Sequence, residues 1–344
     1  MAVELSIYDV SPFIYCANYV NKYADKKNYG FKIGGLQYLM KFVSLDLSVG
    51  KDVVLCFDSR SFRKDLLQSY KASRTPNHEV FAQLKLAYDL LPKCGIVCYK
   101  KDGYEADDLI YNIVQAQKKN YYKIRIYGSD YDLAHNVDER TVTFESMSSQ
   151  VNSIDCRNFS TSIEVGKRIM FNTITAYKIL FGDKSDEYKA FVSTKGIQPS
   201  FLYTKFQEML KAQPTYPPAE ITSSRRTFEA FVNWIKPILS NEDLEELKLR
   251  MDIAFPAEIH DMDFSQVTSL ASINKDSMAS FLALTRDTTS CKSLRLPVLG
   301  LTEQQQKYLS SLSHQLKTGE FAVDNNLSVN PVNVGTKMIN MREF

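Results

Sequence analysis

Hydrophobic and polar positions follow two alternating patterns over the first half of the chain. Short apolar runs, typical of buried strands, alternate with segments whose apolar residues recur at helical spacing. The strand-like runs lie at 5–9, 53–58, 95–99, 123–127 and 141–145, and the clearest helical segments at 33–49 and about 104–118. Strands that alternate with helices imply a parallel sheet covered by helices. The sequence therefore predicts an α/β fold.

After about residue 160 the pattern changes to helices alone. Helical spacing is found at 169–181, 199–210 and 226–239, and a further helix is expected to start at Asn241 with that residue as its N-cap. From 317 to 344 the chain is rich in Asn and Val and shows little periodicity, which predicts a flexible tail. We expect a catalytic-type α/β domain at 1–190, a helical region at 191–316 and the tail at 317–344.

The composition indicates in which compartment the protein acts, but says little about its function. The chain has 344 residues, with 44% hydrophobic and 24% charged residues and a net charge of +2, so overall charge does not indicate a nucleic-acid partner. Its six cysteines follow no disulfide or zinc spacing, which indicates thiols in a reducing compartment. The N-terminus has no basic leader, and no apolar run approaches the ~18 residues of a membrane span. We expect a cytoplasmic protein.

Carboxylates form five short clusters, and all but one follow a strand-like run. They are Asp9; Asp58; Glu105, Asp107 and Asp108; Asp130 and Asp132; and Asp183 and Asp186. Because ligands of parallel sheets bind beyond the carboxyl ends of the strands, we expect these acids to gather at one edge. Gathered like charges need neutralisation, and oxygen ligands without Cys or His select magnesium or manganese. Nine acids exceed the needs of one ion, so two ions about 4 Å apart are predicted.

Each cluster also has a simpler interpretation. A single Asp after a strand is often a helix cap or turn former, and the acids at 105–108 could do no more than cap a helix. The GSDYD segment at 128–132 could be only a turn. The occurrence of all five clusters together favours metal binding over these alternatives.

A basic stretch lies between the acid clusters. Residues 60–74 hold Asp65 as the single acid against five basic residues, Arg60, Arg63, Lys64, Lys71 and Arg74, with Phe62 and Tyr70 interleaved. Basic side chains contact phosphates and an aromatic ring can stack on an unpaired base. In isolation such a run is more often a solvated helix face; beside a metal site it predicts a grip on a polyanion.

These segments together resemble the 5′ nuclease family, which includes flap endonucleases, the 5′-exonuclease domain of bacterial DNA polymerase I and phage enzymes. The resemblance covers about 5–190 and rests on Asp9, FDSRSFRKDLLQSYKASRTP at 57–76, YEADD at 104–108, GSDYD at 128–132 and GDKSD at 182–186, in that order. Within the family the chain is most similar to the bacteriophage ribonuclease H that removes lagging-strand primers.

The resemblance implies a PIN-like, mostly parallel central sheet flanked by helices, with a helical C-terminal region that contacts duplex. It implies two Mg²⁺ ions, for which Mn²⁺ can substitute. The first would be held by Asp9, Asp58, Glu105, Asp107, Asp108 and Asp130, and the second by Asp132, Asp183 and Asp186. Tyr70, Lys71 and Arg74 would lie at the base of an arch formed by about 59–92, with Lys71 on the scissile phosphate. Arg60, Arg63, Lys64 and Lys195 would contact nucleic acid.

One segment departs from the family pattern. The family grips duplex DNA through a helix-hairpin-helix with two closely spaced glycines and a following lysine. Here residues 194–200 read TKGIQPS, with Gly196 alone. Backbone amides need such glycines to approach phosphate, so the sequence leaves open whether this segment makes a duplex contact or holds a potassium ion.

The expected function is a metal-dependent 5′→3′ nuclease acting near the 5′ end of RNA–DNA or DNA duplexes, as a monomer on forked, flapped or RNA-primed substrates. Primer removal in phage replication, in the host cytoplasm, is its expected role. The final residues, 338–344, could dock on a replication partner such as a single-strand-binding protein or sliding clamp, or be an unstructured end. A PIN-type ribonuclease on single-stranded RNA and a non-catalytic flap-binding scaffold remain as alternatives.

Overall fold

The computed structural model describes residues 3–17, 21–73, 75–137, 141–146, 174–182, 191, 196–197, 199–212 and 225–321. Its contacts divide the chain into two compact units. The first comprises Met1–Arg60, Thr75–Gly128 and Asp261–Phe344, and the second comprises Ser61–Arg74 and Ser129–His260. Among the described helices, none is both long and apolar enough to cross a membrane.

The first unit is built on parallel strands. They are β1 (Glu4–Asp9), β4 (Asp52–Cys56), β5 (Cys98–Tyr99) and β6 (Lys123–Gly128), and their order across the sheet is β5-β4-β1-β6. All the neighbouring pairs, β5 with β4, β4 with β1 and β1 with β6, run parallel. The central strand β1 is covered on both faces, and Leu5, Ile7 and Tyr8 are fully buried. The predicted parallel α/β fold is confirmed.

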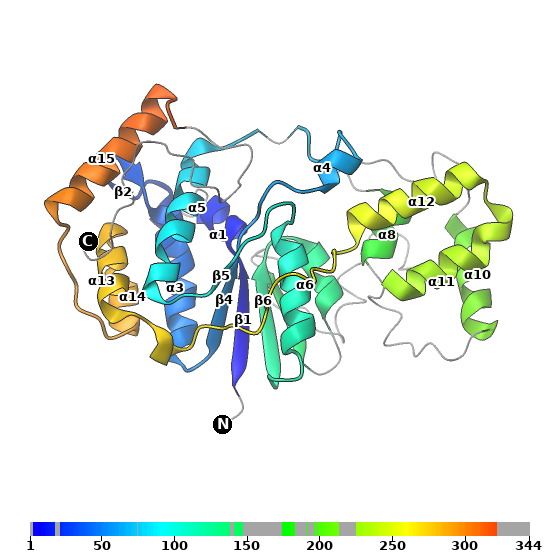
Figure 1. Ribbon diagram of the computed structural model, residues 1–344, viewed down its shortest axis with the longest axis horizontal. Coiled ribbons are helices and arrows are strands. Elements are labelled where there is room, and N and C mark those ends of the chain that lie inside the picture. The colour runs from blue at the N-terminus through cyan, green and yellow to red at the C-terminus, as the bar shows by residue number, and fades with distance from the viewer. Residues whose placement is uncertain are drawn as a thin grey trace. The chain divides into compact units, whose positions relative to one another are not determined.

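Helices cover this sheet from both sides. They are α1 (Val10–Ala17), α2 (Asn21–Ala24), α3 (Gly34–Ser48), α5 (His78–Leu90) and α6 (Ala106–Gln117), with the 3₁₀ turn η1 (Pro92–Cys94) and the small hairpin of β2 (Lys27–Asn28) and β3 (Phe31–Lys32). Figure 1 shows α3 and α5 to one side of the sheet and α6 to the other. The stripe of α6 that carries Leu109, Ile110 and Ile113 is fully buried, as helical spacing requires.

The chain returns to the first unit after Asp261. This part contains η4 (Leu270–Ser272), α13 (Lys275–Leu284), α14 (Thr288–Ser293) and α15 (Glu303–Thr318). Val53 and Thr268 exchange both backbone hydrogen bonds, at 2.8 and 2.9 Å, and the Gln117 amide donates to the carbonyl of Phe264. The sequence alone assigns these residues to a helical region that begins at 191, because such long-range pairing leaves no trace in local periodicity.

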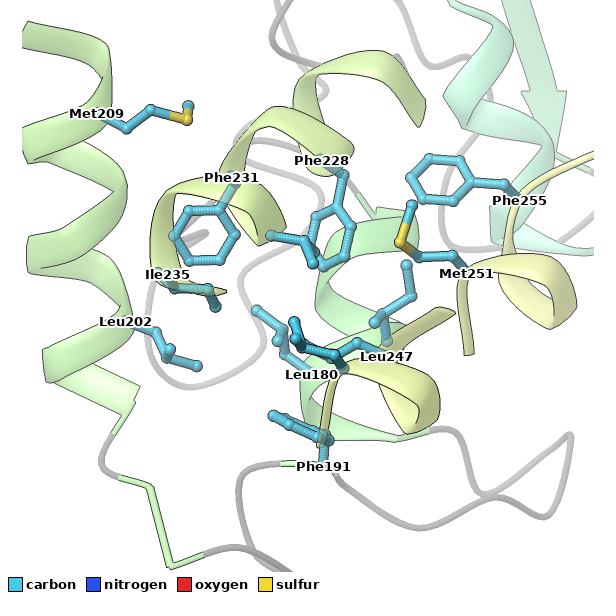
Figure 2. Packing of buried hydrophobic residues seen from close by; sticks show 13 residues of the cluster. Leu180, Phe191, Leu202, Met209, Phe228, Phe231, Ile235, Leu247, Met251 and Phe255 are labelled. Carbon is cyan, nitrogen blue, oxygen red and sulfur yellow. The ribbon is translucent and has the colours of Figure 1, made fainter. Parts of the chain in front are cut away.

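The second unit is mainly helical. It contains α4 (Arg63–Leu66), η2 (Tyr131–Asn136), β7 (Val142–Ser146), α8 (Ile174–Phe181), α10 (Pro199–Ala212), α11 (Arg225–Ile235), η3 (Lys236–Ile238) and α12 (Asn241–Ala254). Figure 2 shows the side chains that α8, α10, α11 and α12 contribute to its core. Leu180, Phe231 and Leu247 are fully buried there. Burial of these apolar stripes, more than helix propensity, stabilises helices of this length.

The helix α12 has its N-cap one residue earlier than the sequence suggests. Ser240 is its N-cap: its hydroxyl accepts the backbone N–H of Asp243 at 3.1 Å, and the Asp243 carboxylate accepts the backbone N–H of Ser240 at 3.1 Å. Asn241 is the first helical residue. The expectation that Asn241 caps this helix is therefore wrong, because the Ser240–Asp243 capping box satisfies two amides at once.

Candidate active site

Asp9 and Asp58 lie at the same edge of the sheet. Asp9 is the last residue of β1, opposite Cys56 at the end of the parallel neighbour β4, and Asp58 follows Cys56 by two residues. Both carboxylates act on one buried thiol: burial raises the pKa of Cys56 well above its ordinary value, and Asp9 and Asp58 raise it further. The structure thus brings these two acids together at the carboxyl ends of the strands, as parallel pairing requires.

Asp58 connects three elements at this edge. Its Oδ2 accepts the hydroxyl of Ser11 on α1 at 2.5 Å, and its Oδ1 accepts the backbone N–H of Ala106, the first residue of α6, at 2.9 Å. The backbone N–H of the next residue, Ser59, donates to the carbonyl of Tyr104 at 3.2 Å. The loop before α6 is therefore held against the end of β4, which places the acids at the start of α6 beside Asp58.

Glu105 and Asp108 cap α6. The Glu105 side chain accepts the backbone N–H of Asp108, and Asp108 Oδ2 accepts the backbone N–H of Glu105 at 3.0 Å. Both residues are buried, whereas Asp107 is partly exposed. The capping interpretation of this cluster is therefore correct for two of its acids. It does not exclude metal binding, because a carboxylate offers about four lone pairs and the cap occupies one of them.

The acids that follow β6 belong to the second unit. Asp130 is the N-cap of η2 and accepts the backbone N–H of Asp132 at 3.2 Å. Asp132 Oδ2 forms an ion pair with Lys178 on α8, and the ring of His135 lies against its carbonyl. The GSDYD segment thus forms the turn that was its simpler interpretation. Asp130 remains exposed and Asp132 is partly exposed.

A metal centre is not assembled within the part of the chain that the structure describes. No three His, Cys, Asp or Glu side chains among those residues lie in position to share one ion. Asp183 and Asp186 lie outside the described residues, as do Arg74, Lys195 and the chain from residue 322 onward. The ligand set inferred from the sequence therefore stays a prediction. The donors at the Asp9–Asp58 edge are carboxylates and a hydroxyl, the oxygen chemistry that Mg²⁺ and Mn²⁺ prefer.

The basic stretch divides into exposed and buried positions. Arg60 and Lys64 are exposed. Arg63 is 2% exposed, and its guanidinium donates to the carbonyl of Ile253 at 2.7 Å and to that of Phe255 at 3.1 Å. This burial favours a packing role for Arg63 over contact with nucleic acid.

Tyr70 is buried, whereas its neighbour Lys71 is partly exposed. Tyr70 is 3% exposed and packs against Ile253 with Leu67 and Leu249 around it. Lys71 adopts the left-handed conformation at φ 52° and places Nζ 4.8 Å from the centre of the Tyr70 ring. Tyr70 is therefore a support for the backbone of this turn, whereas Lys71 remains partly exposed.

Comparison with known proteins shows which family the first half of the chain resembles. Residues 4–164 match the model of the 5′-3′ exonuclease, N-terminal resolvase-like domain. By this match residues 4–164 are similar to the N-terminal domain of 5′-3′ exonucleases. The resemblance to 5′ nucleases is confirmed; its finer placement beside phage ribonuclease H stays a prediction.

Two sequence relatives and one solved structure illustrate what the chain is similar to. The thermostable DNA polymerase I of Thermus thermophilus is 37% identical over 94 residues, which are 26% of this chain and 11% of the polymerase. A 5′-3′ exonuclease of Mycoplasma pneumoniae is 26% identical over 216 residues, 57% of this chain and 72% of that protein. A solved structure of the bacteriophage T5 D15 flap endonuclease with DNA and metal ions is 16% identical, covers 91% of this chain and all of that one, and has a TM-score of 0.48. The chain thus spans about a tenth of the polymerase relatives' length.

The exonuclease-family match includes all of the predicted acids except Asp183 and Asp186. One residue that sequence reasoning missed is Ser11, whose hydroxyl contacts Asp58. Ser11 lies two residues after Asp9 in the first turn of the next helix, which indicates that it is near the site but does not identify its partner. Its partner lies 47 residues away, and no local pattern could have identified that contact.

Proposed function

We propose that this chain is a metal-dependent 5′→3′ nuclease of the ribonuclease H and flap endonuclease type. It hydrolyses phosphodiesters near the 5′ end of RNA–DNA or DNA duplexes, and its role is the removal of lagging-strand RNA primers in phage DNA replication. The observation that carries the proposal is the meeting of Asp9, Asp58 and the start of α6 at one sheet edge, inside residues matched to the exonuclease domain.

Oxygen donors at that edge fit a hard divalent ion, Mg²⁺ or Mn²⁺. We assign the first ion to Asp9, Asp58, Glu105, Asp107, Asp108 and Asp130 and the second to Asp132, Asp183 and Asp186. When bound, such ions supply a hydroxide at neutral pH and stabilise the leaving oxygen. Asp58 is held at both oxygens, so its position is fixed before substrate arrives.

The basic side chains have separate tasks in this proposal. Lys71 and Arg74 neutralise charge that develops on the phosphoryl oxygens. The exposed Arg60 and Lys64, together with Lys195, contact backbone phosphates and supply salt-dependent affinity. Arg63 and Tyr70 stabilise the segment that presents Lys71, since both are buried.

Cleavage of 5′-labelled substrates tests the proposal. The panel contains an RNA-primed duplex, a DNA flap, a nicked duplex and single-stranded RNA, each with Mg²⁺, Mn²⁺ or EDTA. We expect metal-dependent release of short 5′ products, reduced on the order of 100-fold or more by Asp9→Asn or Asp58→Asn. Asp89→Asn is the matched control, because Asp89 lies on the surface of α5 in an ion pair with Lys85 at 2.7 Å.

Each alternative predicts a different result from the same panel. Cleavage of single-stranded RNA alone would favour a PIN-type ribonuclease. Tight flap binding without metal-dependent turnover would favour a scaffold. Full activity in an Asp107→Asn, Asp130→Asn double variant would contradict the assignment of these acids to the metal site.

A further inference from the structure

Ser11 makes a hydrogen bond to Asp58, and the proposed metal and phosphate chemistry does not itself require this bond. It lies in the first turn of α1, two residues after Asp9, and donates its hydroxyl to Asp58 Oδ2 at 2.5 Å. The other oxygen of the same carboxylate accepts the backbone N–H of Ala106 at 2.9 Å. Each oxygen of Asp58 therefore has its own donor, and the two donors come from separate helices.

Two anchors on different oxygens fix a carboxylate more completely than one. A single hydrogen bond allows the group to rotate about the bonded oxygen, whereas a second bond from a different direction defines the plane of the carboxylate. Each oxygen has two lone pairs, so each keeps one available after these bonds. Asp58 is also partly exposed, so the remaining lone pairs are accessible from solvent.

The partner of Ser11 is unusual for a serine in the first turn of a helix. Such serines commonly bond to backbone groups of their own turn. Ser290 on α14 shows the local arrangement: its hydroxyl donates to Asp287 Oδ2 at 2.6 Å, three residues away, within an N-cap. Ser11 instead bonds to an acid 47 residues away, in the loop that follows β4.

We propose that Ser11 is a positioning residue that orients the Asp58 carboxylate toward a divalent metal ion. This inference rests on the proposed nuclease function and adds a residue to it. Groups that hydrogen-bond to a metal ligand typically change metal affinity 10–100-fold when they are removed. Ser11 acts through Asp58, while the backbone N–H of Ala106 provides the anchor that no side-chain substitution removes.

Direct metal binding provides the test, without substrate and without turnover. Mn²⁺ binding to the full chain is measured by electron paramagnetic resonance for the wild type, Ser11→Ala, Ser11→Thr and Ser11→Val. We expect Ser11→Ala and Ser11→Val to weaken Mn²⁺ binding about 10–100-fold. Ser11→Thr should stay within about 3-fold of the wild type, because it keeps the hydroxyl. Threonine and valine have the same shape, so this pair isolates the hydroxyl even if the alanine variant fails to fold.

Ser290→Ala is the matched control. It removes a serine-to-aspartate hydrogen bond of similar length in the same unit. Ser290 also contacts Ser44, which lies in the last part of α3, and the chain runs from there into the start of β4. Ser290 thus belongs to the opposite edge of the sheet from Asp58. We expect Ser290→Ala to lower the melting temperature and leave Mn²⁺ affinity unchanged.

The outcomes separate the inference from the function on which it rests. Equal Mn²⁺ affinity of the threonine and valine variants would overturn the role of Ser11 while leaving the nuclease proposal intact, provided that the wild type binds metal and cleaves. A comparable loss of affinity in Ser290→Ala would show a general effect of instability and also overturn it. A wild type that neither binds Mn²⁺ nor cleaves any 5′-labelled substrate would overturn both.

Discussion

Replacement of Arg63 tests whether this residue belongs to the fold or to nucleic-acid binding. Its guanidinium is 2% exposed and donates to two backbone carbonyls, those of Ile253 and Phe255. Arg63→Met keeps most of the apolar stem and removes both bonds. Hydrogen bonds to charged groups contribute about 1.5–3 kcal/mol each, so we expect a loss of about 3 kcal/mol at the lower end of that range.

Urea unfolding measures this loss. Trp234 is the single tryptophan of the chain and lies on α11 in the same unit as Arg63, at 37% exposure, so its fluorescence reports the unfolding of that unit. With a slope of about 2 kcal/mol per molar urea, a loss of 3 kcal/mol lowers the midpoint by about 1.5 M.

Lys64→Met is the matched control, because Lys64 is the exposed neighbour on the same helix. It should leave the urea midpoint unchanged and weaken substrate binding at low salt. A midpoint shift below about 0.3 M for Arg63→Met would refute the structural role of Arg63. So would equal shifts for the two variants.

Three further predictions concern ionisation, backbone strain and metal binding. A hydrogen bond from Arg125 lowers the pKa of Glu4 to about 2 from its ordinary 4.5, so this group stabilises the fold above pH 4.5. The stability difference between the wild type and Glu4→Gln should close as pH falls from 4.5 toward 2 in acid titrations of the melting temperature. Gly95→Ala should lower the melting temperature of the protein more than Gly103→Ala does. Both glycines have positive φ, but of the two only Gly95 would bring the new Cβ against a backbone atom, the Ser272 carbonyl oxygen at 2.3 Å. Divalent metal at 100 times its Kd should raise the free energy of unfolding by about 2.7 kcal/mol, reversibly with EDTA, and no stabilisation would contradict the metal assignment.

Local periodicity predicted the sheet and its functional edge. The strand-like runs that end in Asp9 and precede Asp58 are neighbouring parallel strands, and the acids of 105–108 do open a helix. These features follow from side-chain periodicity and from the short connections of an α/β unit, both of which are encoded over a few residues. The same reasoning placed Asp9 and Asp58 at one edge without any knowledge of their contacts.

Long-range contacts account for what the sequence did not reveal. In the sequence, Arg63 is one of several basic residues in a basic stretch. Its burial depends on the carbonyls of Ile253 and Phe255, which lie 190 and 192 residues away. The pairing of Thr268 with Val53 and the bond from Ser11 to Asp58 are of the same kind. A charge pattern therefore identified the segment that carries the basic residues, but not which of them face solvent.

Capping and metal binding at the start of α6 are compatible roles of the same acids. The reciprocal bonds of Glu105 and Asp108 satisfy amides at the helix N-terminus, where the helix dipole also favours negative charge. Asp58 joins them through the Ala106 amide, so several carboxylates are held close to one helix end by backbone donors. Like charges at short range repel, and the amides offset only part of that repulsion. A cation would offset the rest, so an edge that is already ordered by caps needs little rearrangement to accept one.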